Sequence, residues 1–193
     1  MTEYLKDGRP RLPPNQVVTQ KFPVMTAGTP TTGGKEIWSL TLDGDVAQPV
    51  ALDWQGLMAL PQQEFIVDIH CVTRWSKLDT RWRGVSVTLL ADLVGPRPEA
   101  TYVQARADGS YSANLRLADL LEDKAFVATE YEGQPLAEDH GGPARLVVPG
   151  LYFWKSAKWL RGLHFSPFDY KGYWEKLGYH NYGDPWKEQR YRE

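Results

Sequence analysis

The chain contains one cysteine, Cys71, and the stretch that follows it, Arg74 to Arg83, is crowded with arginines, tryptophans and a lysine. Nearby cations favour the thiolate, which is the form of cysteine that binds metals or attacks electrophiles. A thiolate is a soft ligand and selects its metal accordingly. The alternative is that Cys71 is a small buried hydrophobic residue without a chemical role. Cys71 is therefore the first candidate for chemistry, as a metal ligand or as a nucleophile.

A second stretch, from His140 to Leu160, carries groups suited to an anion. Glycines at positions 141, 142 and 150 allow a ligand to approach the backbone closely. The donors beside them suit a phosphate, and they are Arg145, Lys155, Ser156 and Lys158. Taken alone, these residues are equally compatible with a solvated basic loop.

The cysteine stretch resembles the molybdopterin-dependent oxidoreductases of the sulfite oxidase fold. In that family a cysteine in a Cys-Val-x-x-Trp-Ser setting, with Trp-x-Gly-Val downstream, ligates molybdenum. The matching residues here are Cys71, Val72, Trp75, Ser76, Trp82, Gly84 and Val85. The resemblance runs from about Pro13 to Asn181 and implies a molybdenum-molybdopterin cofactor whose metal is bound by Cys71.

The second stretch is similar to the same family. Its members carry a His- or Asn-Gly-x-Pro-x-Arg segment that runs into Val-Val-Pro, followed by a Ser-x-Lys-Trp segment, and they hold the pterin phosphate there. The residues at those positions, in the same order and separation, are His140, Arg145, Ser156, Ala157 and Lys158. The resemblance implies that they bind the cofactor.

Other positions are assigned by the resemblance alone. It implies that Phe22 and Pro23 lie across the pterin, that Ala107 contacts the cofactor through its backbone, and that Tyr111 stands near the substrate. Arg74 is the candidate for an anion site, although sulfite oxidases typically follow the cysteine with Ala-Gly-Asn-Arg where this chain has Val-Thr-Arg-Trp-Ser. That departure speaks against sulfite as the substrate.

The predicted function is oxygen-atom transfer to or from a small substrate containing sulfur or nitrogen, with electrons exchanged with an external donor or acceptor protein. One alternative is a cysteine-nucleophile hydrolase or transferase, in which a histidine serves as base to Cys71. Another is a non-enzymatic protein that binds molybdopterin. The first alternative predicts a histidine near Cys71, and the second predicts bound pterin that undergoes no redox change.

Strands are expected to position the residues of the two stretches. Alternating apolar and polar residues predict a strand from Glu64 to Val72 that carries Cys71 at its end. Further strands are predicted at 36–43, 101–107, 125–131 and 145–148, and helices at 53–59 and 85–94. Strands that outnumber helices without regular alternation indicate an α+β, mainly β domain. The resemblance makes this the mixed-sheet sulfite oxidase-type fold with short helices.

The 193 residues fit one domain, 1–193, with an extended Pro/Gly-rich arm at 1–35 and an aromatic tail at 172–193. The tail could be a lid, a partner surface, or a segment packed over its own sheet. A net charge of −2 argues against a nucleic-acid binder. We expect a cytoplasmic protein without a membrane span, because no signal peptide is visible and no apolar run approaches the ~20 residues that a span requires.

Overall fold

Two β-sheets bring the cysteine stretch and the anion-binding stretch together in the computed structural model, which describes residues 3–27, 34–122 and 125–192. The first sheet follows the order β1-β5-β8-β10, with β4 paired to β5 and β9 paired to β8. Its strands are β1 (Val17–Val18), β4 (Gln63–His70), β5 (Trp75–Ser86), β8 (Phe126–Tyr131), β9 (Gln134–Pro135) and β10 (Arg145–Val147). Both stretches therefore belong to this sheet.

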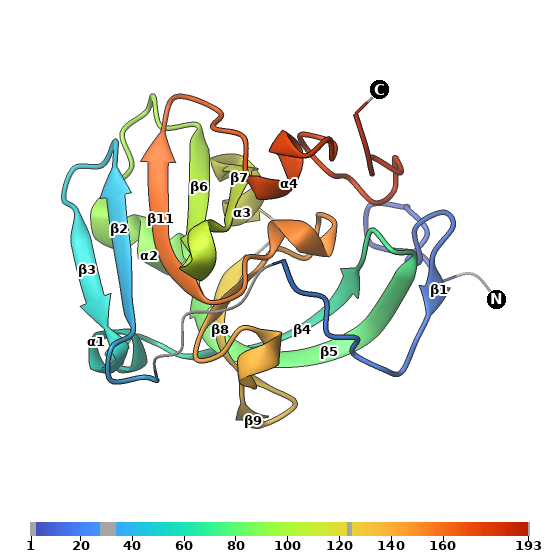
Figure 1. Ribbon diagram of the computed structural model, residues 1–193, viewed down its shortest axis with the longest axis horizontal. Helices are drawn as coiled ribbons and strands as arrows, with labels where there is room; N and C mark the ends of the chain where they lie inside the picture. The colour runs from blue at the N-terminus through green and yellow to red at the C-terminus, as the bar shows by residue number, and fades with distance from the viewer. Residues whose placement is uncertain (1–2, 28–33, 123–124, 193) are drawn as a thin grey trace.

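The second sheet has the order β3-β2-β11-β6-β7 and lies on the left in Figure 1. Its strands are β2 (Ser39–Gly44), β3 (Val50–Asp53), β6 (Tyr102–Ala107), β7 (Ser112–Arg116) and β11 (Leu160–Ser166). Each sheet contains one parallel pair, β1 with β5 and β2 with β11, among antiparallel neighbours. The predicted mixed-sheet α+β fold is confirmed.

The helices are short. They are α1 (Trp54–Ala59), α2 (Val87–Val94), α3 (Leu117–Glu122) and α4 (Tyr173–Lys176), with single 3₁₀ turns η1 (Asp108–Ser110), η2 (Glu138–His140) and η3 (Phe153–Lys155). Asp53 caps α1 as predicted, because its side chain accepts a hydrogen bond from the Gly56 amide at 2.7 Å. No helix among the described residues is both long and apolar enough to cross a membrane.

The predicted helix at 85–94 begins two residues later than expected. Val85 and Ser86 complete β5 instead, and the Ser86 hydroxyl accepts from the Leu89 amide at 3.1 Å, which caps α2. The helix packs the side chains of Val87, Leu90 and Val94 into the core. Residues from both sheets, such as Leu40, Val127 and Leu163, belong to that same core, so the two sheets share one hydrophobic core.

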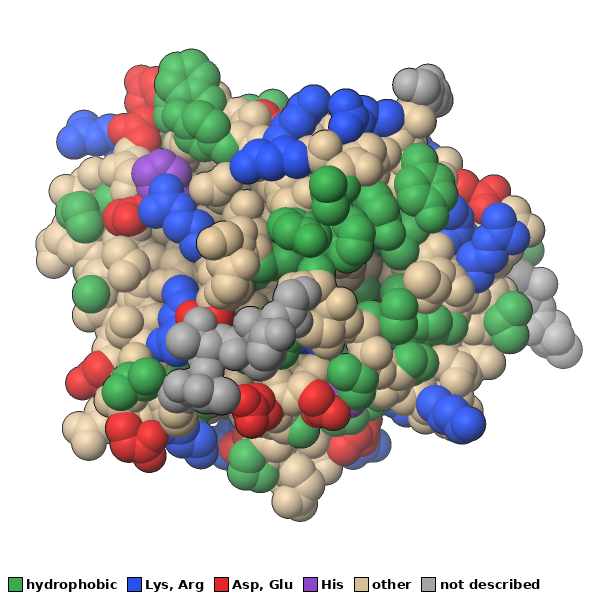
Figure 2. All heavy atoms as spheres, viewed as in Figure 1, with side chains coloured by type: hydrophobic (Ala, Val, Ile, Leu, Met, Phe, Trp, Pro, Cys, Tyr) green, Lys and Arg blue, Asp and Glu red, His purple; other side chains and the backbone are tan. Residues whose placement is uncertain are grey.

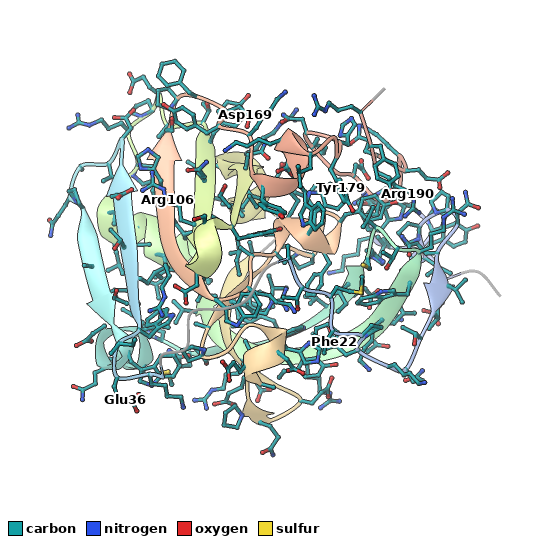
Figure 3. All side chains as sticks on the ribbon, viewed as in Figure 1. Phe22, Glu36, Arg106, Asp169, Tyr179 and Arg190 are labelled. Carbon is teal, nitrogen blue, oxygen red and sulfur yellow. The ribbon has the colours of Figure 1, made fainter. Side chains whose placement is uncertain are left out.

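The arm and the tail lie on the side where the first sheet ends (Figure 1). Apart from β1, the described part of the arm has little regular structure, and the predicted arm also includes residues 28–33, which lie outside the described part of the chain. The tail forms α4 and an isolated bridge between Tyr179 and Tyr191. Figure 3 shows Tyr179 and Arg190 of the tail on the same side of the molecule as Phe22 of the arm.

Candidate active site

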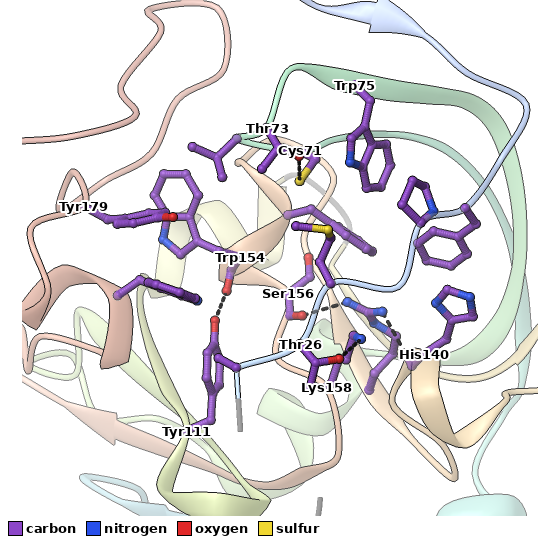
Figure 4. Close-up of a pocket in the computed structure, with 18 of the residues that line it drawn as sticks. Thr26, Cys71, Thr73, Trp75, Tyr111, His140, Trp154, Ser156, Lys158 and Tyr179 are labelled. Carbon is purple, nitrogen blue, oxygen red and sulfur yellow. Dashed lines mark hydrogen bonds between the residues drawn. The ribbon is translucent and has the colours of Figure 1, made fainter. Parts of the chain in front are cut away.

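The arm, the Cys71 loop, the loop after β10 and the tail enclose one pocket (Figure 4). It contains the predicted residues Phe22, Pro23, Cys71, Tyr111, His140, Arg145, Ser156 and Lys158. It also contains residues that were not predicted as site residues, of which Val72 and Trp75 belong to the cysteine motif: Met25, Thr26, Ala27, Val72, Thr73, Trp75, Phe153, Trp154, Trp159, Trp174 and Tyr179. The structure thus brings the thiol and the predicted anion-binding donors to one cavity.

Cys71 follows the last residue of β4 and begins the turn into β5. Its amide donates to the carbonyl of Trp75 at 2.8 Å, and its carbonyl accepts from the Arg74 amide at 3.0 Å. The side chain is 7% exposed, and its sulfur lies 3.1 Å from the Thr73 hydroxyl. Burial raises the pKa of the Cys71 thiol, against the opposing effects of the Thr73 hydrogen bond and of Arg190. Burial therefore opposes formation of the thiolate, which is the nucleophilic form of cysteine.

Two side chains from opposite ends of the chain hold the Cys71 loop. Gln16, in the arm, donates from Nε2 to the Cys71 carbonyl at 3.0 Å. Arg190, in the tail, donates from Nη1 to the Val72 carbonyl and lies over the Tyr152 ring, 4.9 Å from its centroid. Gln16 and Arg190 are both buried. The sequence did not predict either contact, because neither residue stands in a motif.

Arg74 does not line the pocket. It is exposed and adopts a left-handed backbone conformation, with φ of 73°. That conformation closes the turn between Cys71 and Trp75, so the position of Arg74 follows from the turn geometry. The cation whose charge acts on the Cys71 thiol is Arg190. The structure gives no support to the predicted anion-binding role of Arg74.

The other side of the pocket is positively charged (Figure 4). Arg145 and Lys158 line it, and no Asp or Glu is found among the described residues that line the pocket. Burial lowers the pKa of Arg145 to about 9. Burial also lowers the pKa of Lys158 to about 8, and the charge of Arg145 adds to this effect. Two cations facing a cavity without a carboxylate form a site for an anion.

Backbone carbonyls orient these cations. Arg145 donates to the carbonyls of His140 and Ser156, each at 2.8 Å, and Lys158 donates to that of Asp139 at 2.6 Å. Gly141, with φ of 105°, makes the close approach possible: a side chain there would meet the Lys158 Cβ at 2.9 Å.

His140 stacks on Phe22, with ring centroids 3.9 Å apart and an angle of 10° between the planes. The stack joins the arm to the loop that precedes β10, at the cationic side of the pocket. Burial lowers the pKa of His140, so that the imidazole is neutral near pH 7. Its buried Nδ1 has no hydrogen-bond partner within the described parts of the chain.

Two predicted cofactor contacts lie elsewhere. Ala157 is buried in the core and does not line the pocket, and its carbonyl accepts from the Leu146 amide. Ala107 also lies outside the pocket lining, and its amide donates to the carbonyl of Tyr111 across the hairpin turn. Tyr111 does line the pocket, and its hydroxyl donates to the carbonyl of Trp154.

Lys155, predicted as a phosphate donor, forms a buried ion pair with Glu175 instead. Its Nζ lies 2.7 Å from Glu175 Oε1 and donates to Asn114 Oδ1 and to the Asn181 carbonyl, each at 2.7 Å. The Lys155 and Glu175 side chains are each 1% exposed. This ion pair fastens the loop that lines the pocket to the tail.

Comparison with known proteins decides the family. The family model for the oxidoreductase molybdopterin binding domain matches residues 26–174. The chain belongs to this family. It is 44% identical over 182 residues to the uncharacterized oxidoreductase YuiH of Bacillus subtilis (strain 168), covering 94% of this chain and 92% of that protein. The resemblance drawn from the cysteine stretch is therefore confirmed, and the chain is an oxidoreductase of the sulfite oxidase-like family.

More distant relatives are longer. The protein-methionine-sulfoxide reductase catalytic subunit MsrP of Pseudomonas syringae pv. tomato is 28% identical over 179 residues, which are 83% of this chain and 52% of that one. Sulfane dehydrogenase SoxCD from Paracoccus pantotrophus has the same fold, with a TM-score of 0.66 at 22% identity. That match covers 72% of this chain and 40% of the SoxCD chain. The chain thus spans about half the length of these relatives.

The cofactor of this molybdopterin-binding family is molybdenum-molybdopterin, and the pocket fits it. The pterin ends in a phosphate, which suits the two cations that no pocket carboxylate neutralises. Its metal takes sulfur ligands, which suits the thiol of Cys71 at another wall of the same cavity. Both ends of the cofactor therefore meet complementary groups.

Proposed function

We propose that this oxidoreductase transfers an oxygen atom to or from a small sulfur- or nitrogen-containing substrate, with molybdenum bound by Cys71 and the pterin phosphate held by Lys158 and Arg145. The observation that carries the proposal is that one pocket joins the thiol of Cys71 to Arg145 and Lys158, with no Asp or Glu among the described residues of its lining. When bound, the cofactor supplies two-electron redox chemistry. The protein supplies binding, orientation and the exclusion of water.

The chain's own residues divide this work. Lys158 and Arg145 neutralise the phosphate, and their backbone anchors keep both cations in place. The stacked rings of Phe22 and His140 supply a flat, uncharged wall for the pterin. The Thr73 hydroxyl contacts the Cys71 sulfur and so orients this metal-binding atom toward the pocket.

The walls beside Cys71 favour an uncharged substrate. Val72, Thr73, Trp154 and Tyr179 line the pocket without a charged group, and Arg74 lies outside it. Arg190, whose charge acts on the Cys71 thiol, does not line the pocket either. The negative charge of sulfite would therefore meet no cation among the described residues of that wall, whereas a sulfoxide or an N-oxide is neutral overall. The name of MsrP, a protein-methionine-sulfoxide reductase, agrees with a substrate of this class.

The cysteine-nucleophile alternative receives less support. The histidine that lines the pocket, His140, stacks on Phe22 away from the Cys71 sulfur (Figure 4). His70 precedes the cysteine, but its Nδ1 is paired with the Ser76 hydroxyl at 2.8 Å and its ring packs edge-on against Trp186. Neither histidine is placed as a base for the thiol, whose pKa burial raises.

The test is elemental and pterin analysis of protein purified from a host that makes molybdopterin. Turnover would be assayed with a reduced dye and methionine sulfoxide, dimethyl sulfoxide or trimethylamine N-oxide. We expect near-stoichiometric molybdenum and pterin in the wild type, pterin without turnover in Cys71→Ser, and loss of pterin in Lys158→Met. Arg74→Met is the matched control and should keep both groups and the activity. Full turnover in Cys71→Ser would contradict the proposal.

Two further proposals accompany this function. We propose that electrons pass to or from an external protein, because the described residues account for binding of one cofactor only. We also propose that the protein is located in the cytoplasm. Fractionation of the native host with an antibody against the chain would test the location.

A further inference from the structure

An exposed surface of aromatic, aliphatic and basic side chains lies beside the pocket. We call it the tail rim, and it consists of Tyr173, Lys176, Leu177, Tyr191 and Arg192. Leu177 and Tyr191 are 62% and 60% exposed, although both are large apolar side chains. Figure 2 shows Lys and Arg side chains gathered next to a hydrophobic patch over α4 and the tail. Exposed patches of this kind mark sites of interaction.

The tail rim is continuous with the pocket wall through contacts between rings. Tyr191 packs on Tyr179 with centroids 5.3 Å apart, and Tyr179 packs on Trp174 at 4.7 Å. Trp174 in turn contacts Tyr173 at 5.2 Å. Tyr179 and Trp174 both line the pocket, so an unbroken series of aromatic rings leads from the cavity to the exposed surface.

The two charged residues of the tail rim, Lys176 and Arg192, are both cations. Between Tyr170 and Gly183 the exposed charged side chains are Lys171 and Lys176, and the single carboxylate there, Glu175, is buried against Lys155. Arg192 adds a further positive charge, and its Nη2 donates to the Lys176 carbonyl at 3.3 Å. The rim is therefore positive, although the whole chain has a net charge of −2.

We propose that the tail rim is the docking site of an acidic redox protein that exchanges electrons with the cofactor, an inference that rests on the proposed function. Aromatic residues and arginine are enriched in protein interfaces, and charge complementarity speeds association and sets its orientation. Electron-transfer encounters also use small contact areas. The rings between the rim and the pocket shorten the gap that electrons must cross.

Reduction of a sulfoxide substrate consumes two electrons and two protons. The acidic partner supplies two electrons, the solvent supplies two protons, and the sulfur–oxygen bond breaks to give a sulfide and water. In the opposite direction water supplies the oxygen atom and releases two protons to the solvent, and the partner accepts the two electrons. In either direction the partner is the redox co-reactant, so it must reach a surface that communicates with the pocket.

The experiment mixes dithionite-reduced holoenzyme with oxidised cytochrome b5, an acidic one-electron probe, in a stopped-flow instrument at several salt concentrations. We expect Lys176→Glu/Arg192→Glu to lower the second-order rate at low salt by at least about tenfold and to remove its salt dependence. Arg81→Glu/Arg97→Glu changes the charge equally at exposed positions outside the rim and should leave the rate unchanged. Tyr191→Leu keeps an apolar contact and should slow electron transfer without weakening binding.

Two controls separate this inference from the proposed function. Turnover with methionine sulfoxide and a small uncharged electron donor should be the same in all variants, because none of these residues lines the pocket. Binding of labelled cytochrome b5 to the same variants, measured by fluorescence anisotropy without turnover, tests the surface even if the cofactor proves inactive. Wild-type rates and binding in Lys176→Glu/Arg192→Glu would overturn the proposal, as would faster reaction with the basic cytochrome c.

Discussion

Removing the ammonium group of Lys155 should destabilise the protein strongly, because its partner would remain buried. In Lys155→Met, the Glu175 carboxylate keeps the Trp154 indole N–H as a donor at 2.7 Å but loses its counter-charge. Breaking one side of a buried ion pair costs about 3–5 kcal/mol of unfolding free energy. In a domain of this size each kcal/mol lowers Tm by roughly 2–4 °C, so we expect Tm to fall by about 6–20 °C.

The assay is urea denaturation of the cofactor-free protein, followed by tryptophan fluorescence. The transition midpoint should fall without a change in slope, since the surface exposed on unfolding stays the same. The double variant Lys155→Met/Glu175→Leu should recover more than half of the loss, because it removes the uncompensated charge as well.

Arg83→Met is the matched control for a surface pair. Arg83 lies 3.2 Å from Glu130, but its side chain is 48% exposed, so its loss should cost less than about 1 kcal/mol. If Lys155→Met costs no more than Arg83→Met, burial does not make the Lys155–Glu175 pair indispensable.

Three further predictions concern single side chains. Burial lowers the pKa of His70 from 6.5 to about 4, so on acidification the unfolded state binds a proton at a higher pH than the folded state does. The free energy of unfolding should therefore fall by about 3 kcal/mol as pH drops from 6.5 to about 4. Urea denaturation should show a weaker pH dependence in His70→Gln. Because burial lowers the pKa of Lys158 to about 8, affinity of the cofactor-free protein for inorganic pyrophosphate should fall as pH rises through 8, and calorimetry should find a smaller fall through pH 8 in Lys158→Met. Arg190→Met should lose roughly 1.5–3 kcal/mol in urea denaturation, because the Val72 carbonyl loses the charged donor that the buried Arg190 side chain supplies, whereas exposed Arg192→Met should not.

Local patterns predicted several elements correctly. The alternation in 64–72 corresponds to β4, and the capping residue Asp53 begins α1. The twelve-residue strand β5 was missed, because its many charged residues were attributed to the chemistry of Cys71. These charges occupy the exposed face of a strand whose other face buries Ser76, Thr80 and Trp82. Strand β11 was also missed, since its pairing with β2 and β6 joins segments far apart in the chain.

The sequence by itself determined the family, the cofactor and the two stretches that meet in the pocket, because the identity and the order of chemical groups are properties of the chain. Only the tertiary structure decided which of the neighbouring groups face that pocket. The left-handed turn at Arg74 directs one cation outward, and Glu175 draws Lys155 into the core. Arg190 reaches the Cys71 loop only because the tail folds back onto it, since Arg190 and Val72 are 118 positions apart in the sequence. Such contacts depend on long-range packing, which spacing along the sequence does not encode.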